Sequence, residues 1–245
     1  MAEAPTCPLC AGTASALAYT VGPFSIRRCA GCSHGFVAPM PSDEDLRRLY
    51  QASDDSLYAN GVANQVAEYL DGDPDRFRTY YRDRLAAVRR TGVGTDGRVL
   101  DFGCTNGAFV TALTRNGFSR ALGFDIARDL VAQGRERWGA DLHTGPLDEF
   151  LGNEADGFEV VHAVNVFEHL PNPRQVLEAL STRLRHPGGL VLTVPNAAAL
   201  QVRLLGRHSP VIAPPHHLQY FTPKTLRALR RSGQANLCQR DERGC

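Results

Sequence analysis

The stretch Val99-Leu-Asp-Phe-Gly-Cys-Thr-Asn-Gly-Ala-Phe109 decides the fold. It joins a short apolar run, Arg98–Phe102, to a helical pattern over Ala108–Arg115. Between them, Gly103 and Gly107 can take positive φ and allow a ligand close to the backbone. A strand, a glycine turn and a helix in this order are typical of the first unit of a nucleotide-binding α/β sheet, although an ordinary β-α turn has the same pattern.

The alternation of strand and helix continues along the chain. We expect further strands at Ala121–Phe124, Asp141–Thr144, Phe158–Val164 and Leu190–Val194. We expect further helices at Ala127–Trp138, Arg174–Arg185 and Pro223–Ser232, the second of them ending at Pro187-Gly188-Gly189. Because the strands are apolar on both faces, the pattern predicts an α/β fold with a Rossmann-like, doubly wound, mostly parallel sheet over residues 98–245.

Residues 41–97 indicate a helical segment that caps this sheet. Ser42 is placed to cap a helix over Asp43–Tyr50, whose first turn is acidic. Asp73-Pro74 opens a second helix, with an apolar stripe from Phe77 to Val88. The aromatic residues of this segment are expected either to shape a binding pocket or to pack on the sheet; they are Tyr58, Phe77, Tyr80 and Tyr81.

Residues 1–40 contain two C-x2-C pairs, Cys7/Cys10 and Cys29/Cys32, separated by eighteen residues. This spacing is typical of a zinc ribbon, because four thiolates suit tetrahedral Zn²⁺ and leave no open position. The alternatives are a redox pair and a chance arrangement. His34 is interpreted as a surface residue, since the four thiols already complete the shell.

The composition excludes several classes of protein. The 245 residues carry a net charge of +1 and a single lysine, which makes a nucleic-acid partner a weak hypothesis. No stretch is long and apolar enough to cross a membrane, and residues 1–6 do not resemble a secretory signal. The sequence therefore predicts a cytoplasmic protein with reduced cysteines and no membrane partner.

The glycine stretch resembles motif I of the class I S-adenosylmethionine (SAM)-dependent methyltransferases. Four later segments are similar to further motifs of the ubiquinone-type and small-molecule branch of that family: 122–125, 158–173, 187–196 and 216–223. Several bacterial small-molecule and deoxysugar methyltransferases also carry an N-terminal four-cysteine module, so the resemblance includes the zinc-binding module proposed for residues 1–40. The resemblance covers about residues 7–232.

The resemblance implies a cofactor site for SAM. Asp101, Gly103 and Gly107 would hold its methionine part, and Asp125 would accept hydrogen bonds from the ribose hydroxyls. The remaining positions that the resemblance assigns are Ile126 against adenine, Leu147 and Asp148 near the adenine edge, and Asn165 beside the sulfonium.

Two features depart from the family pattern. Thr105 stands where a glycine is usual, and a β-branched residue is poorly suited to positive φ. The fold normally ends with two more strands after its last helix, but residues 233–245 are mostly polar. We expect at most one short strand there, over Ala235–Cys238. An open sheet edge would then make a homodimer one way to cover it.

Three histidines are candidates for the general base. His169 follows the expected strand at 158–164, whereas His216 and His217 lie on a loop rich in proline. At most one of the two adjacent histidines is expected to point into the site. For each residue the alternative is a packed or capping histidine without a catalytic role.

The sequence therefore predicts SAM-dependent methyl transfer to a small molecule such as a sugar, a polyketide or another metabolite, at O, N or C. Two other hypotheses stay open. The first is an RNA methyltransferase, since zinc modules also occur in that class. The second is a non-catalytic, decayed cofactor-binding protein, which Thr105 and the short C-terminal segment would favour.

Overall fold

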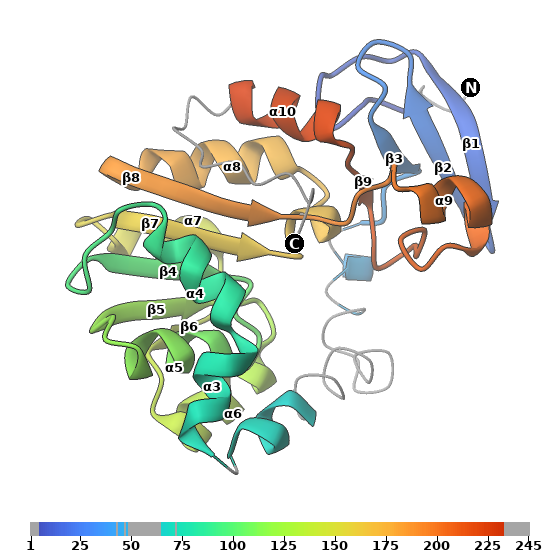
Figure 1. Cartoon of the computed structure of the whole chain (residues 1–245). Helices are drawn as coiled ribbons and strands as arrows, with labels where there is room; N and C mark the ends of the chain where they lie inside the picture. Colours follow the sequence, from blue (N-terminus) through green and yellow to red (C-terminus); the bar gives the residue numbers. More distant parts are fainter. Residues whose placement is uncertain (1–4, 43, 47, 49–64, 72, 233–245) are drawn as a thin grey trace.

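The computed structural model describes residues 5–42, 44–46, 48, 65–71 and 73–232 (Figure 1). It contains a large parallel sheet with helices on both faces and a smaller antiparallel sheet beside the carboxyl ends of its strands (Figure 1). The predicted Rossmann-like fold is confirmed. No helix in these described ranges is long and apolar enough to span a bilayer.

The large sheet has the strand order β6-β5-β4-β7-β8, and every neighbouring pair is parallel. Its strands are β4 (Arg98–Phe102), β5 (Arg120–Phe124), β6 (Leu142–His143), β7 (Phe158–Val164) and β8 (Leu184–Thr193). The order reverses at β4, so the loops after β4 and β7 diverge there. Ligands of open parallel sheets bind at such a switch point.

Helices cover both faces of this sheet, and alternate strand residues divide between two cores. Val99 packs with α3 (Pro74–Tyr80), α4 (Arg82–Arg89), α5 (Ala108–Arg115) and α6 (Arg128–Trp138). Leu100 packs on the other face with α7 (Leu147–Asn153), α8 (Pro173–Thr182) and α10 (Pro223–Ser232). This two-sided burial explains why the strands are apolar throughout.

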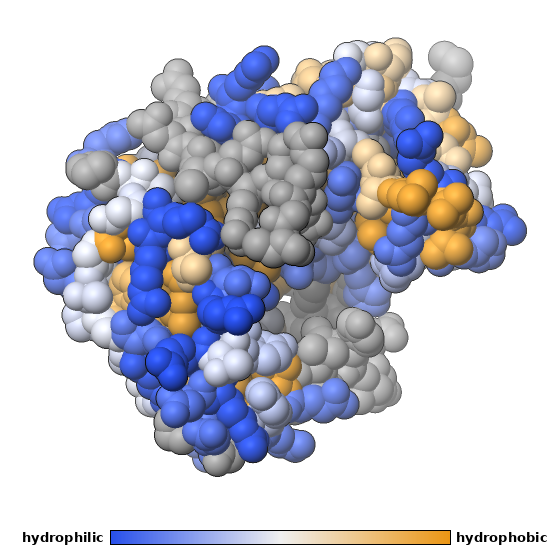
Figure 2. Space-filling view, in the orientation of Figure 1, coloured by the Kyte–Doolittle hydropathy of each residue, from blue (hydrophilic) through white to orange (hydrophobic). Residues whose placement is uncertain are grey.

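The small sheet has the order β1-β2-β3-β9 and is antiparallel. Its strands are β1 (Ser15–Val21), β2 (Phe24–Cys29), β3 (Gly35–Ala38) and β9 (Gln219–Tyr220). A third core joins this sheet to α9 (Leu200–Leu205), which the short η2 (Gly206–His208) follows. Exposed leucines, among them Leu17, Leu200 and Leu204, lie on this side, where Figure 2 shows apolar patches between hydrophilic residues.

Two predicted helices differ in their bounds. The helix that begins at Pro74 divides at Tyr81, whose φ of −98° and ψ of 14° separate α3 from α4 while its ring is buried against Phe109. The helix expected to reach Arg185 ends at Thr182, and β8 begins at Leu184 instead of Leu190.

The reason for the early start of β8 is an irregular pairing. Phe158 pairs with Leu184 and Val160 pairs with Gly189, so extra residues of β8 bulge between these two points. A Cβ on Gly188 would lie 2.3 Å from the carbonyl oxygen of Arg185, which only glycine avoids. The Pro-Gly-Gly segment thus forms a bulge inside the strand rather than a loop before it.

The elements without a counterpart in the sequence-based expectation include the strands β1–β3 of the cysteine module and the short α7, α9 and β9. The cap at Ser42 is present, since its hydroxyl accepts a hydrogen bond from the backbone N–H of Asp45 at 3.1 Å. Residues 44–46 and 48 of that helix are helical, whereas its other residues, Tyr58 and the segment 233–245 lie outside the described residues. Phe77 and Tyr81 pack in the core, whereas Tyr80 is 51% exposed.

Candidate functional site

The glycine turn after β4 lies against the end of β5. The backbone N–H of Gly103 donates to the carbonyl of Phe124 at 2.8 Å, and Gly107 precedes α5 at a φ of 73°. A Cβ on Gly103 would lie 2.3 Å from Cγ2 of Val166, which follows β7. The three loops after β4, β5 and β7 therefore meet closely at the switch point.

Thr105 occupies the left-handed region with a φ of 50°. Its backbone N–H donates to Oδ2 of Asp125 at 2.8 Å, and its hydroxyl donates to the carbonyl of Cys104 at 2.8 Å. These contacts hold a β-branched residue in a conformation that glycine would adopt without strain. The loop thus accommodates a threonine where the family usually has glycine, and the backbone of Thr105 is strained.

Asp125 holds the loop together from the end of β5. Its Oδ1 accepts the backbone N–H of Ala127 at 2.9 Å, while Oδ2 accepts that of Thr105. Burial raises the pKa of this carboxyl, and the backbone hydrogen bonds lower it in part. Each oxygen has a second lone pair, so the carboxylate can still accept hydrogen bonds from a ligand.

Asp101 is buried and forms a pair with a residue that the sequence reasoning missed. Its Oδ1 lies 2.7 Å from Nδ1 of His162, the neighbouring residue on β7. Nε2 of His162 is buried without a hydrogen-bond partner, and the ring lies 4.3 Å from that of Phe109. The signal was a single histidine within an apolar strand.

The other predicted cofactor positions lie around the same edge. Ile126, directly after Asp125, is 52% exposed. Leu147 is partly buried and Asp148 exposed at the start of α7. Asn165 is exposed after β7 with a φ of 56°, and its N–H donates to the carbonyl of Thr193 at 2.9 Å.

A cluster of Glu168, His169 and His217 lies where η1 (Phe167–His169) meets the loop before β9. The rings of His169 and His217 are 5.1 Å apart, and Nε2 of His169 is 3.8 Å from Oε1 of Glu168. The His216 side chain is exposed, and its carbonyl accepts a hydrogen bond from Nδ1 of His169 at 2.7 Å. Of the two adjacent histidines, His217 is the one that joins His169.

Burial sets the charge of this cluster. It lowers the pKa of His169 to about 4 and also lowers the pKa of His217, so both rings are neutral near pH 7. It raises the pKa of Glu168 to about 7, and neither carboxylate oxygen has a hydrogen-bond partner. Sequence reasoning missed Glu168, although its position next to His169 was a usable signal.

The four cysteines of the N-terminal pairs converge. Sγ of Cys7 lies 3.7 Å from that of Cys32, and Sγ of Cys10 lies 3.5 Å from that of Cys29. All four sulfurs lie within 4.8 Å of one another. A tetrahedral zinc with Zn–S bonds of about 2.3 Å places its sulfurs about 3.8 Å apart, so the donor set fits this ion.

His34 is a correction to the sequence-based interpretation, because it is buried rather than on the surface. Its Nε2 lies 2.9 Å from Oε1 of Gln219, and its ring packs on Phe221 at 4.8 Å. Burial lowers its pKa to about 4. His34 therefore links the cysteine module to β9, a contact that spacing along the chain does not reveal.

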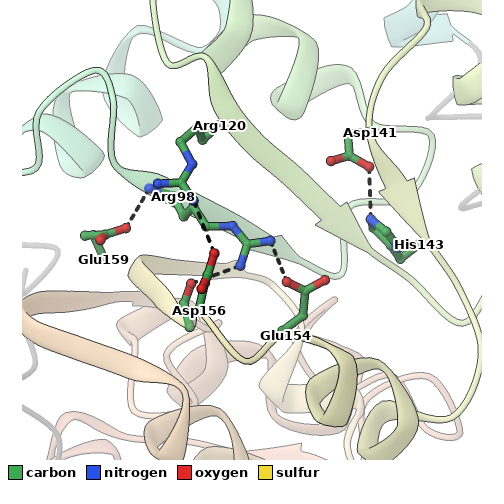
Figure 3. Close-up of polar contacts among 8 residues, drawn as sticks. Arg98, Arg120, Asp141, His143, Glu154, Asp156 and Glu159 are labelled. Carbon is green, nitrogen blue, oxygen red and sulfur yellow. Dashed lines mark hydrogen bonds and ion pairs between the residues drawn. The ribbon is translucent and has the colours of Figure 1, made fainter.

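A cavity of about 500 Å³ opens at the amino edge of the large sheet, where its strands begin. It lies between the start of β5 and the ends of α5 and α6. Charged residues surround that edge (Figure 3). The loops after parallel strands, not those before them, form ligand sites in this class of fold. We therefore place the candidate site at the carboxyl edge.

Comparison with known families assigns the chain to a family. The model of a family described as a methyltransferase domain matches residues 74–238. The match covers the second part of the helical segment, from α3 onward, the glycine turn and the whole parallel sheet. The chain belongs to this methyltransferase family.

Curated relatives point the same way. A ubiquinone biosynthesis O-methyltransferase of Aeromonas salmonicida is 28% identical over 159 residues, which are 60% of this chain and 65% of the relative. That of Xanthomonas campestris (strain B100) is 27% identical over 158 residues, 57% of this chain and 63% of the relative. The chain thus aligns with somewhat less than two thirds of the length of these relatives.

Solved structures share the fold. A SAM-dependent methyltransferase from Archaeoglobus fulgidus has a TM-score of 0.51 at 20% identity, over 70% of this chain and 74% of that one. The magnesium protoporphyrin IX methyltransferase of Synechocystis PCC 6803, solved with bound SAH, has a TM-score of 0.55 at 13% identity, over 78% and 89%. At these identities the likeness concerns the fold alone.

Proposed function

We propose that this chain transfers a methyl group from SAM to a small-molecule acceptor. The observation that carries the proposal is the closed contact between the glycine turn and Asp125, at the switch point of a sheet from a methyltransferase family. The bound cofactor supplies a methyl group activated on a sulfonium. The residues of this chain bind the cofactor, orient the acceptor and accept its proton.

The carboxyl edge offers the groups that the cofactor requires. In this proposal the remaining lone pairs of Asp125 accept hydrogen bonds from the ribose hydroxyls. The exposed Ile126 covers adenine together with Leu147 and Asp148. Asp101, Gly103, Gly107 and Asn165 hold the methionine end. These assignments rest on the family resemblance and on the position of each residue at one edge of the sheet.

The acceptor side is assigned to the histidine cluster. Nδ1 of His169 and Nδ1 of His217 each face a backbone carbonyl, of His216 and Val211, at 2.7 and 2.8 Å. A carbonyl only accepts, so each Nδ1 carries the proton and each Nε2 keeps its lone pair. A neutral imidazole in that tautomer can take a proton from an O, N or C acceptor. We assign no such role to the exposed His216.

The four-cysteine module is proposed to hold a structural Zn²⁺. Backbone N–H groups of Leu9, Cys10, Gly31 and Cys32 donate to the sulfurs of Cys7 and Cys29. Such donors offset negative charge that accumulates on thiolates around an ion. The module would keep β9, and with it the loop that carries His217, in place.

Calorimetric titration of SAM into the zinc-loaded protein tests the cofactor proposal. We expect saturable binding that is lost in Asp125→Ala and weakened in Asp101→Ala. Asp156→Ala is the matched control, because Asp156 is an exposed carboxylate at the opposite edge of the sheet. No binding to a folded wild-type protein would refute the proposal and favour a decayed family member.

A further inference from the structure

We propose that Glu168, His169 and His217 bind a divalent transition-metal cation. The three side chains offer one carboxylate and two imidazole nitrogens whose atoms lie within 4.8 Å of one another. The site would be the second metal site of the chain and differs in kind from the four-cysteine site. Two imidazoles and one carboxylate are a donor set typical of Zn²⁺, Fe²⁺ and related cations.

The first observation behind the proposal is the orientation of the two histidines. Each Nδ1 donates to a backbone carbonyl, so each Nε2 is the nitrogen with a free lone pair, and that of His169 lies 3.8 Å from Oε1 of Glu168. Metal-binding histidines in proteins are held in this way, with the second nitrogen fixed by a carbonyl or carboxylate. The two histidines come from different segments, η1 and the loop before β9, so the fold itself brings them together.

The second, independent observation is the state of Glu168. Its residue is 1% exposed, yet both carboxylate oxygens lack a hydrogen-bond partner. A buried polar group without a partner is costly, and an ionised one more so. A cation bonded to one or both oxygens would remove this cost. The backbone carbonyl of Glu168 is already engaged by the N–H of Leu218 at 2.7 Å, which fixes the residue beside His217.

The distances leave room for the ion. Nε2 of His169 and Oε1 of Glu168 are 3.8 Å apart. Ligand atoms at about 2.1 Å from a metal lie roughly 3–3.5 Å from one another, so small rotations of the side chains complete the site. Three protein ligands leave at least one open position, unlike the closed four-cysteine site.

The open position gives the ion a role in the proposed function, on which this part of the inference rests. An acceptor oxygen or nitrogen bound there would lose its proton more readily and would be oriented toward the cofactor side of the site. The two histidines would then act on the acceptor through the ion rather than as free bases. Occupancy of the site can be measured without any methyl transfer.

The test is a titration of Co²⁺, followed by calorimetry and by visible absorption, into protein that carries one equivalent of Zn²⁺ for the four-cysteine module and no excess zinc. We expect one Co²⁺ per chain, with no sulfur-to-metal charge-transfer band, because the ligands are nitrogen and oxygen. Glu168→Gln and His217→Ala should each weaken this binding at least about tenfold. His216→Ala is the matched control and should bind Co²⁺ as wild type does, since its side chain is exposed.

SAM titrations of the same variants separate this inference from the proposed function. Retained SAM binding in Glu168→Gln and His217→Ala shows that they are folded and that only the metal site has changed. Absence of a Co²⁺ site in wild type, or undiminished Co²⁺ binding in both variants, overturns the inference and leaves the histidines as free bases. If the wild-type protein does not bind SAM, the proposed function is refuted whatever the Co²⁺ result.

Discussion

The two edges of the large sheet differ in chemistry. At the amino edge, Arg98 donates to the carboxylate of Glu154 and to the carbonyl of Gly157, and its backbone N–H donates to Glu159 (Figure 3). At the carboxyl edge, Thr105 is held at positive φ and Glu168 is buried without a hydrogen-bond partner. Satisfied groups gather at one edge and strained or unpaired groups at the other, as expected where one edge serves stability and the other serves binding.

We expect the largest effect from removing the buried ion pair at the amino edge of the sheet. Arg98→Met leaves the carboxylate of Glu154, whose side chain is 11% exposed, without its cation. We expect the free energy of unfolding in urea to fall by about 3 kcal/mol, while the Kd for SAM is unchanged.

Arg120→Met is the control on the same edge. Its ion pair with Asp156 spans 3.8 Å between exposed side chains, so its loss should cost less than about 1 kcal/mol. Equal losses in the two variants would contradict the distinction between a buried and an exposed pair.

The next effect concerns the support of the glycine turn. A Cβ on Gly134, in α6, would lie 2.1 Å from the carbonyl oxygen of Asn106 in that turn. Gly134→Ala should therefore lower stability by about 1–3 kcal/mol and raise the Kd for SAM, because the backbone of the turn must move. Thermal unfolding and calorimetry measure the two effects.

Gly152→Ala in α7 is the comparison, since no atom lies within 4 Å of its added Cβ. Alanine is the better helix former, so this variant should match or exceed the wild type in stability. If both alanine variants behave alike, the close packing of α6 on the turn has no energetic weight.

A smaller effect of opposite sign is expected at Thr105. Thr105→Gly removes a side chain that is strained at a φ of 50°, and we expect a gain of about 1 kcal/mol in unfolding free energy. Thr114→Gly, within α5, should instead lose a few tenths of a kcal/mol, because glycine is a poor helix former. A loss in both variants would show that the contacts of Thr105 outweigh its strain.

The smallest effect is the pH dependence of SAM binding through Asp125. Burial raises the pKa of this carboxyl above its ordinary 3.8. As pH falls through the raised pKa, the carboxyl takes up a proton and would accept the proposed hydrogen bonds from the ribose hydroxyls less well, so the Kd for SAM should rise. Titrations between about pH 4 and 7 measure this change, and Asp125→Asn should show no such inflection.

The sign for folding is the opposite. A carboxyl with a raised pKa in the folded state binds its proton more tightly there than in the unfolded chain. Its contribution to stability is therefore greatest at low pH and declines as pH rises through the raised pKa. Hence wild type should lose stability relative to Asp125→Asn across that window.

The regular part of the fold was predictable because local patterns determine it. The strand at Arg98–Phe102 and the helix at Ala108–Arg115 agree with β4 and α5 in both bounds. A buried parallel strand is apolar throughout, and a glycine turn marks its end, so neighbouring residues carry the whole signal. The two cysteine pairs were informative for the same reason.

The missed features depend on contacts between distant segments. Gln219 lies in β9 and pairs with Phe36 of β3. Because β9 has only two residues, it has no periodicity to detect. The burial of His34 follows from that pairing, and the partner of Asp101 lies on a different strand. Bounds were missed where a bulge, as at Gly188, keeps a proline-glycine segment inside a strand. Spacing along the chain contains none of this information.

The pairing of β3 with β9 also sets an order in time. Gly35 and Tyr220 face each other, and His34 meets Gln219 across 185 positions of the chain. At about 5–20 residues per second, a ribosome makes β9 about 10–40 s after β3. During that interval the cysteine module is already synthesised but its outer strand is absent, so the newborn chain presents an open sheet edge beside four thiols.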